Sequence, residues 1–212
     1  MPEKAFVSAL STKSDWRDAV AEAGEKVRDG LGGACDLALL FATDLYPGLE
    51  PILLPSVLQD ALPHQMLLGC NSSGVIGGAR EIELEPAITV LGMRLPGVEL
   101  HPFSLSPGEL GRLESGKGLV EKLDLFPSEK PKFLGLADPM SCDIESLLKF
   151  FNEGYPGAPF VGGLASGPAL GRPSWMVLGD ESLSDGAACV AMTGDVEFEI
   201  AVAQGCRPIG GP

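Results

Sequence analysis

Residues 61–74 read ALPHQMLLGCNSSG, and residues 154–167 read GYPGAPFVGGLASG. The second stretch matches the first at an offset of 93 residues. In both stretches an apolar run of strand type follows a proline and leads into small residues. They therefore predict the same structural unit twice, and the matching positions are Pro63/Pro156, Gly69/Gly162 and Ser73-Gly74/Ser166-Gly167.

The pattern of apolar residues around these stretches extends the similarity over most of the chain. Each unit has the pattern of a strand, a helix, a proline turn, a strand, a Gly/Ser loop and a further pair of strands. We therefore predict a mixed α/β (α+β) fold of two pseudo-symmetric β-α-β-β-β repeats, which form mixed sheets covered by helices. The repeats span about 35–106 and 131–206, and residues 107–130 connect them.

Two predictions concern the strands that complete the units. Residues 88–95 and 98–103 are strand-like segments on either side of Pro96-Gly97, which predicts a hairpin. Residues 197–204 predict a last strand near the C-terminus.

The composition excludes several classes of protein. Lys and Arg total 15 against 29 Asp and Glu, which gives a formal net charge of −14, and no basic stripe occurs. Because nucleic acids and anionic lipids bind through clustered Lys and Arg, we expect neither nucleic acid nor membrane as a partner. The five cysteines are widely spaced, and the chain shows neither a secretory signal nor an apolar run of membrane-spanning length. These features predict reduced thiols and a cytoplasmic protein.

The glycine- and serine-rich ends of the two matching stretches are the candidate ligand site. Small residues there leave backbone N–H groups and hydroxyls free to hold an anion or a carboxylate. Close packing of the two halves is the alternative reason for the same glycines. The predicted ligand-binding residues are Gly69, Cys70, Asn71, Ser72, Ser73, Gly74, Gly162, Gly163, Ser166 and Gly167.

Two arginines add to this candidate site, because a guanidinium can hold a carboxylate through two parallel N–H bonds. Arg80 follows the first loop, and Arg207 lies near the C-terminus. For Arg80, an ion pair with the neighbouring Glu81 or Glu83 is the simpler explanation.

Cys70 is the best candidate for a nucleophile, because it ends a predicted strand beside possible oxyanion donors. A thiol needs a base or a positive field to become a thiolate, and His64 and His101 are the only histidines. His64 would lie about 20 Å away along the same strand. A plain buried thiol is therefore the favoured interpretation of Cys70, and we predict no catalytic residues, no metal site and no cofactor.

Several blocks of the chain, in the same order, resemble the signature of a known family. LLGCNSSGVIGG at residues 67–78, followed by Arg80-Glu81, resembles the central signature of the FIST N-terminal domain. The later blocks of that family are similar to GLADP, VGGLASG, DG and QGCRPIG at residues 135–139, 161–167, 185–186 and 204–210. By this resemblance residues 1–210 are identified as a FIST N-terminal domain.

The resemblance implies a sensory, signal-transduction domain that binds small ligands such as amino acids. In eukaryotes, related chains carry an F-box, which recruits substrates to a ubiquitin ligase. The family's usual C-terminal partner domain would begin just after Gly210, so we expect this FIST C-terminal domain to be a partner that the chain itself lacks. No F-box-like helical segment precedes Ala5. The family supplies no established catalytic residues to carry over.

The residues and the resemblance together favour a sensory domain for a small, amino-acid-like ligand. The first alternative is a protein-interaction module, the substrate-recruiting part of an F-box-type ubiquitin ligase subunit, with ligase components as partners. An exposed apolar patch without an enclosed pocket would favour this module. The second alternative is a cysteine-dependent hydrolase or transferase, which requires a base within hydrogen-bond reach of Cys70.

Overall fold

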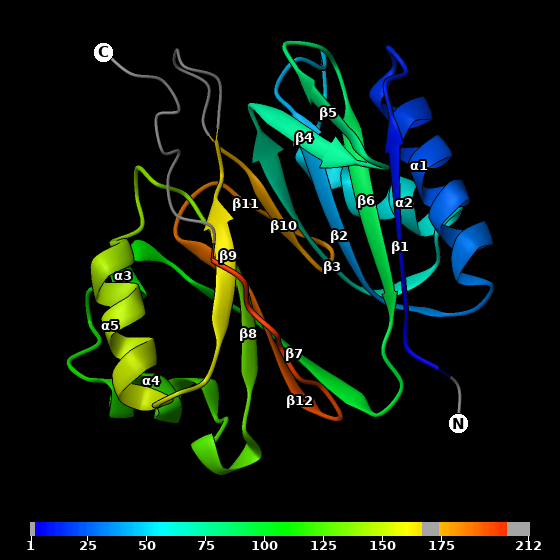
Figure 1. Cartoon of the computed structure of the whole chain (residues 1–212). Coiled ribbons are helices and arrows are strands. Elements are labelled where there is room, and N and C mark those ends of the chain that lie inside the picture. The colour runs from blue at the N-terminus through cyan, green and yellow to red at the C-terminus, as the bar shows by residue number, and fades with distance from the viewer. Residues whose placement is uncertain (1–2, 167–173, 203–212) are drawn as a thin grey trace, which may run out of the picture.

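The computed structural model describes residues 3–166 and 174–202 and arranges them in four layers (Figure 1). Two β-sheets pack face to face; α1 and α2 cover the outer face of the first sheet, and α3, α4 and α5 cover that of the second. This arrangement confirms the predicted mixed α+β class. The helices are α1 Trp16–Leu31, α2 Leu54–Ala61, α3 Pro107–Leu110, α4 Gly116–Leu123 and α5 Ile144–Gly154, with 3-10 turns at Pro51–Leu53 and Pro127–Glu129.

The first sheet has the strand order β1-β6-β2-β3-β10-β11. β2 and β3 run parallel, and the other neighbours in this sheet are antiparallel. Its strands are β1 Ala5–Ser11, β2 Cys35–Thr43, β3 His64–Ser72, β6 Ile88–Arg94, β10 Met176–Leu178 and β11 Glu181–Leu183.

The second sheet has the strand order β7-β12-β8-β9, in which β8 and β9 run parallel. β12 is antiparallel to both of its neighbours. The strands are β7 Val98–Leu105, β8 Lys132–Ala137, β9 Phe160–Leu164 and β12 Ala187–Gly194. A separate two-stranded sheet pairs β4 Gly74–Gly77 with β5 Arg80–Glu83.

Four strands of the first sheet have the same order and directions as the four strands of the second. β1-β6-β2-β3 corresponds in this way to β7-β12-β8-β9. A helix joins the parallel pair in both sheets, α2 between β2 and β3 and α5 between β8 and β9. The predicted helix-linked strand pairs are therefore present, while an internal duplication as their origin stays a prediction.

The predicted hairpin around Pro96-Gly97 is wrong. β6 pairs with β1 and β2 in the first sheet, whereas β7 pairs with β12 in the second. Pro96-Gly97 therefore carries the chain from one sheet to the other, and Gly97 supplies the positive φ of 77° that this turn requires. Local sequence predicts two strands and a tight turn, but long-range contacts decide which sheet each strand joins.

The predicted last strand is also wrong for the residues that the structure describes. Residues 197–202 form no strand, and residues 203–204 lie outside the described part of the chain. Backbone pairing is not what holds the start of this segment. Val196 is buried, and Phe198 is packed against the apolar core between the two sheets.

Apolar packing joins the four layers through three cores. Val20 and Val27 of α1 lie in the core beneath the first sheet, and Phe133 and Phe151 pack edge to face in the core beneath the second. The third core lies between the sheets and includes Cys70. Among the described residues, no helix has the length and apolar character needed to cross a bilayer.

Candidate functional site

The two predicted Gly/Ser loops are in large part β-strand. Residues 69–72 belong to β3, and residues 162–163 belong to β9. Glycine and serine are common in loops, so the pattern predicted loops that begin several residues too early. Each strand instead carries these small residues because of the neighbouring strand against which it packs.

Two matching glycines are required by close backbone packing. A Cβ atom on Gly69 would lie 2.4 Å from the carbonyl oxygen of Leu40 in β2. A Cβ atom on Gly162 would lie 1.8 Å from the carbonyl oxygen of Gly135 in β8. The packing explanation therefore accounts for both glycines, although they lie within strands rather than between the two halves of the chain.

The ends of the two stretches nevertheless meet in space. The backbone N–H of Ser73 donates to Oγ of Ser166 at 3.0 Å, and the backbone N–H of Ser166 donates to the carbonyl oxygen of Asn71 at 3.2 Å. The sequence comparison paired Ser73 with Ser166, and here the two residues are in direct contact. Their roles as ligand-binding residues stay predictions.

Two other predicted residues, Gly74 and Arg80, belong to the separate β4–β5 sheet. Arg80 is exposed in β5, and its side chain makes no hydrogen bond or ion pair within the described part of the chain. Gly74 begins β4, which pairs with β5. Gly167 and Arg207 lie outside the described residues.

Asn71 links the serine contact to a pocket that the sequence did not indicate. Its side chain is buried, with 1% of the residue exposed. Its Nδ2 donates to Oδ1 of Asp44 at 2.7 Å, and its Oδ1 accepts from the backbone N–H of Trp175 at 3.0 Å. Both partners of the Asn71 amide line this pocket.

This pocket, called the Tyr46 pocket below, has a volume of about 460 Å³. It lies where the chain leaves β2, and the β10–β11 hairpin supplies its other wall. Ligands of open α/β sheets often bind just outside the carboxyl ends of parallel strands, and this pocket lies at the carboxyl end of β2. The lining residues are Thr43, Asp44, Tyr46, Leu49, Pro51, Ser174, Trp175, Ser182, Leu183 and Ser184.

The hydroxyl of Tyr46 is the unusual group of this pocket. Only 3% of Tyr46 is exposed, and its Oη has no hydrogen-bond partner among the described residues. Burial, with a smaller contribution from the charge of Asp15, raises the pKa of Tyr46 to about 12, so the phenol is neutral near pH 7. A buried hydroxyl left without a partner costs about 1–3 kcal/mol, which a bound donor or acceptor would recover.

Sequence reasoning missed the Tyr46 pocket because its residues form no recognisable motif. One signal was present: Asp44 and Tyr46 follow directly after the buried strand β2, at the place where α/β sheets bind ligands. The β10–β11 wall could not be assigned from sequence, since Trp175 lies 104 residues from Asn71 along the chain.

Cys70 lacks the surroundings of a nucleophile. Only 3% of the residue is exposed, and burial, with a smaller contribution from Asp44, raises its pKa to about 12. Nδ1 of His64 interacts with the Leu62 carbonyl and Nε2 of His101 with the Thr193 hydroxyl, and among the described residues no hydrogen bond joins either histidine to the thiol. The geometry therefore favours a structural thiol at this position.

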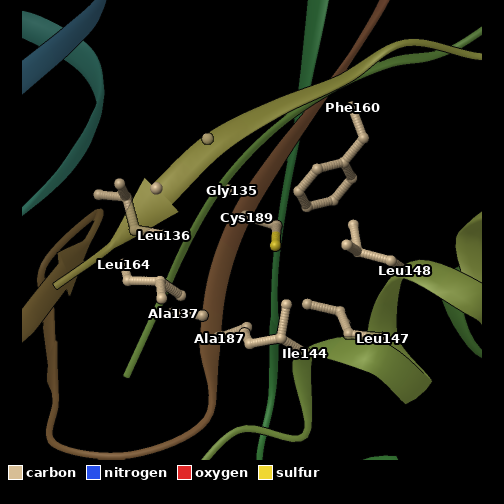
Figure 2. Close-up of a pocket in the computed structure, with 12 residues that line it drawn as sticks. Gly135, Leu136, Ala137, Ile144, Leu147, Leu148, Phe160, Leu164, Ala187 and Cys189 are labelled. Atoms are coloured by element: carbon tan, nitrogen blue, oxygen red, sulfur yellow. The ribbon is translucent and has the colours of Figure 1, made fainter. Parts of the chain in front are cut away.

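A second hollow, of about 260 Å³, is apolar and lies between β9 and α5. Figure 2 shows Ile144, Leu147 and Leu148 of α5 on one side of it and Phe160 and Leu164 of β9 around its edge. Its lining is hydrocarbon apart from the thiol of Cys189 and the backbone. It therefore offers apolar packing and few groups that could orient a polar ligand.

Comparison with known proteins places these features in a family context. A family model described as FIST N domain matches residues 36–212, which confirms the resemblance drawn from the sequence. The chain is 31% identical over 206 residues to an uncharacterized protein of Mycobacterium tuberculosis (strain H37Rv), an alignment of 96% of this chain and 51% of that relative. It is also 31% identical over 204 residues to an uncharacterized protein of Mycobacterium bovis, with the same coverage. The chain thus spans about half the length of the curated relatives it matches.

Proposed function

Because the chain belongs to the FIST N domain family of signalling and sensory domains, we propose that it senses a small polar ligand bound in the Tyr46 pocket. The observation that carries this proposal is the buried Tyr46 hydroxyl, which has no hydrogen-bond partner in the described part of the chain. Proteins rarely leave such a group unsatisfied without a functional reason. A ligand that bonds to this hydroxyl would supply the missing partner.

The lining of the pocket supports an amino-acid-like ligand. The Asp44 carboxylate, which lines the pocket, offers a counter-charge for an ammonium group. Ser174, Ser182 and Ser184 bring hydroxyls to the same pocket. Trp175 adds an aromatic side chain against which an apolar part of the ligand would pack.

Ligand binding in the Tyr46 pocket would affect residues of both sheets. Asn71 bonds to two residues that line the pocket, Asp44 and Trp175, and its carbonyl oxygen accepts from Ser166 just beyond β9. A ligand that prefers one arrangement of these residues would shift the chain toward that arrangement. This coupling is how the proposed sensor would convert binding into a signal.

The test is calorimetric titration with a panel of free amino acids, using the wild-type chain and Tyr46→Phe. We expect saturable binding to the wild type and about two- to tenfold weaker binding to Tyr46→Phe, because the substitution removes one hydrogen bond to the ligand. Tyr155→Phe is the matched control, since the Tyr155 hydroxyl is also buried but donates to the Leu125 carbonyl, away from the Tyr46 pocket. Equal loss of affinity in both variants, or binding that ignores Tyr46→Phe, would contradict the proposed site.

Stability gives this test a second readout. Without ligand, Tyr46→Phe should leave the free energy of unfolding unchanged or raise it, because it removes a hydroxyl that has no partner among the described residues. Tyr155→Phe should lower it by about 1 kcal/mol, because the Leu125 carbonyl loses its donor. The two substitutions should thus differ in their effect on the free energy of unfolding, as expected if the Tyr46 pocket is a binding site that lowers the stability of the fold.

The second candidate function is a protein-interaction module, including the substrate-recruiting role in an F-box-type ubiquitin ligase subunit. The exposed apolar residues of β9 favour interaction with another polypeptide, although nothing in them points to ligase components. Failure of every amino acid in the panel to bind the wild-type chain would favour this candidate. Neither candidate gives Cys70 a catalytic role.

A further inference from the structure

β9 is an exposed edge strand without the usual protection of such strands. Among the described residues, β9 pairs only with β8. Four of its five residues are exposed, and the sequence FVGGL contains neither a charge nor a proline. Edge strands normally carry charges, prolines or bulges because an open edge recruits further strands.

The other edges of the two large sheets are protected or more buried. β7 carries Glu99 and Pro102, and β11 is only three residues long with Glu181 in it. β1 is uncharged, but only Phe6 and Ser8 among its seven residues are exposed. The bare edge of β9 is therefore unusual within this molecule.

The backbone of β9 offers hydrogen-bonding groups along this edge. Pro159 accepts from Phe133 of β8, and the N–H of Ala165 donates to Ala137 of β8. Because consecutive residues of a strand face opposite neighbours, Val161 and Gly163 also face β8. The N–H and C=O groups of Gly162 and Leu164 therefore face outward.

Apolar hollows lie on both faces of β9. The hollow beside α5 is shown in Figure 2, and two of its lining residues, Leu148 and Leu164, are exposed. A further hollow of about 360 Å³ lies on the face toward the first sheet, with Val161 and Leu164 in its lining. The side chains of an added strand alternate between the two faces, so uncharged apolar residues would fill both hollows.

The first sheet shows how such an edge is completed. β3 holds the position in the first sheet that β9 holds in the second, since each is the parallel partner of a helix-linked strand. β3 is not an edge, because β10 pairs with it antiparallel and β11 follows. No described strand does the same for β9.

We propose that β9 is a docking edge that receives an antiparallel, uncharged β-strand from the half of the longer relatives that this chain does not match. The mycobacterial relatives are about twice as long as the matched region, so a polypeptide of that size accompanies this domain in them. Strand addition supplies affinity through backbone hydrogen bonds and specificity through the two apolar hollows. The formal net charge of −14 disfavours a second copy of this chain as the occupant. This proposal does not depend on the function proposed above for the Tyr46 pocket.

Hydrogen–deuterium exchange on this chain and on the full-length Mycobacterium tuberculosis relative tests the proposal. In this chain the amides of Gly162 and Leu164 should exchange rapidly, whereas those of Gly163 and Ala165, which face β8, should be protected. At the aligned positions of the relative, all four amides should be protected. The two outward-facing amides should exchange at least about 100-fold more slowly in the relative than in this chain. Equally rapid exchange of the outward pair in the relative would overturn the proposal.

A charged substitution supplies a second test. Leu164→Lys should leave the melting temperature of this chain nearly unchanged, since Leu164 is 52% exposed, but the aligned substitution should destabilise the relative. Ile76→Lys in β4, where Ile76 is 72% exposed, is the matched control and should be tolerated in both proteins. Tolerance of the β9 substitution in the relative would overturn the proposal. Protection of Gly162 and Leu164 that grows with the concentration of this chain would also overturn it, in favour of a second copy.

Discussion

Gly162 and Gly163, adjacent residues of β9, differ in what a side chain would meet. A Cβ atom on Gly162 would lie 1.8 Å from the Gly135 carbonyl oxygen, whereas a Cβ atom on Gly163 would have no heavy atom within 4 Å. Neither glycine has a positive φ. Position 162 therefore requires glycine because the backbone of β8 leaves no room for a side chain.

Gly162→Ala should lower the free energy of unfolding by about 1–3 kcal/mol, because β8 and β9 must separate to admit the methyl group. Gly163→Ala should change it by less than about 0.5 kcal/mol. Denaturant unfolding of the two variants and the wild type measures both values. A similar cost for both substitutions would show that the close contact between Gly162 and Gly135 does not set the effect, since the loss of glycine flexibility would stabilise both variants.

Asn71→Ala tests the residue that ties the Tyr46 pocket to the end of β9. The substitution leaves the backbone N–H of the half-buried Trp175 without its side-chain acceptor, which should cost about 1–3 kcal/mol in denaturant unfolding. Asn152→Ala is the matched control, since Asn152 is exposed on α5 and should tolerate the change. A neutral effect at Asn71 would mean that its hydrogen bonds do not stabilise the fold.

At the scale of the element, the segment predicted as a connector contains α3 and α4 and contributes to the second core. Leu110 and Leu119 are buried there, and Lys122 of α4 binds Glu109 of α3 with an N–O distance of 2.7 Å. Glu109 also accepts hydrogen bonds from Ser106 at the start of α3. The short helices are therefore held by capping and packing, so this segment adds to the second core besides connecting the two halves of the chain.

The bonds from Lys122 and from Ser106 lower the pKa of Glu109 from an ordinary value near 4.5 to about 2. A carboxyl whose pKa is lower in the folded state stabilises the fold above its unfolded pKa and loses that effect as the pH falls. The contribution of Glu109 should therefore be full above about pH 5 and fade toward pH 2. We expect less than about 1 kcal/mol from it, because the ion pair is partly exposed.

Unfolding measured between about pH 2 and pH 7 for the wild type and Glu109→Gln checks this expectation. Gln keeps the shape of the capping side chain and removes its charge, so the difference between the two proteins should shrink as the pH falls. A difference that stays constant with pH would rule out the ionised carboxylate as its source.

At the scale of the whole molecule, the two sheets enclose a core that shields Cys70 from solvent. The raised pKa, about 12 against an ordinary 9.0, leaves about a thousandfold less thiolate than in a free cysteine at the same pH. An alkylating reagent can therefore react with the Cys70 thiolate only when the two sheets separate. Modification of Cys70 therefore reports on the opening of the sandwich.

Alkylation with iodoacetamide, followed by mass spectrometry of the peptides, should label Cys70 and Cys189 slowly in the native chain and rapidly in guanidinium. Cys189 is fully buried and burial likewise raises its pKa, so it serves as an internal comparison in the second sheet. Rapid native labelling of Cys70 alone would instead indicate an accessible, activated thiol and would restore the catalytic alternative.

The sequence by itself determined the mixed α+β class, the helix-linked strands of the two matching stretches and the family. It could do so because apolar periodicity and turn residues act between near neighbours in the chain. The tertiary structure alone decided that β7 joins the second sheet, that Trp175 lines the Tyr46 pocket and that β9 is an edge among the described strands. These features depend on pairing between residues far apart, such as Asn71 and Trp175, 104 positions apart. Local patterns leave the choice of such partners open, because any strand of suitable length and polarity satisfies them.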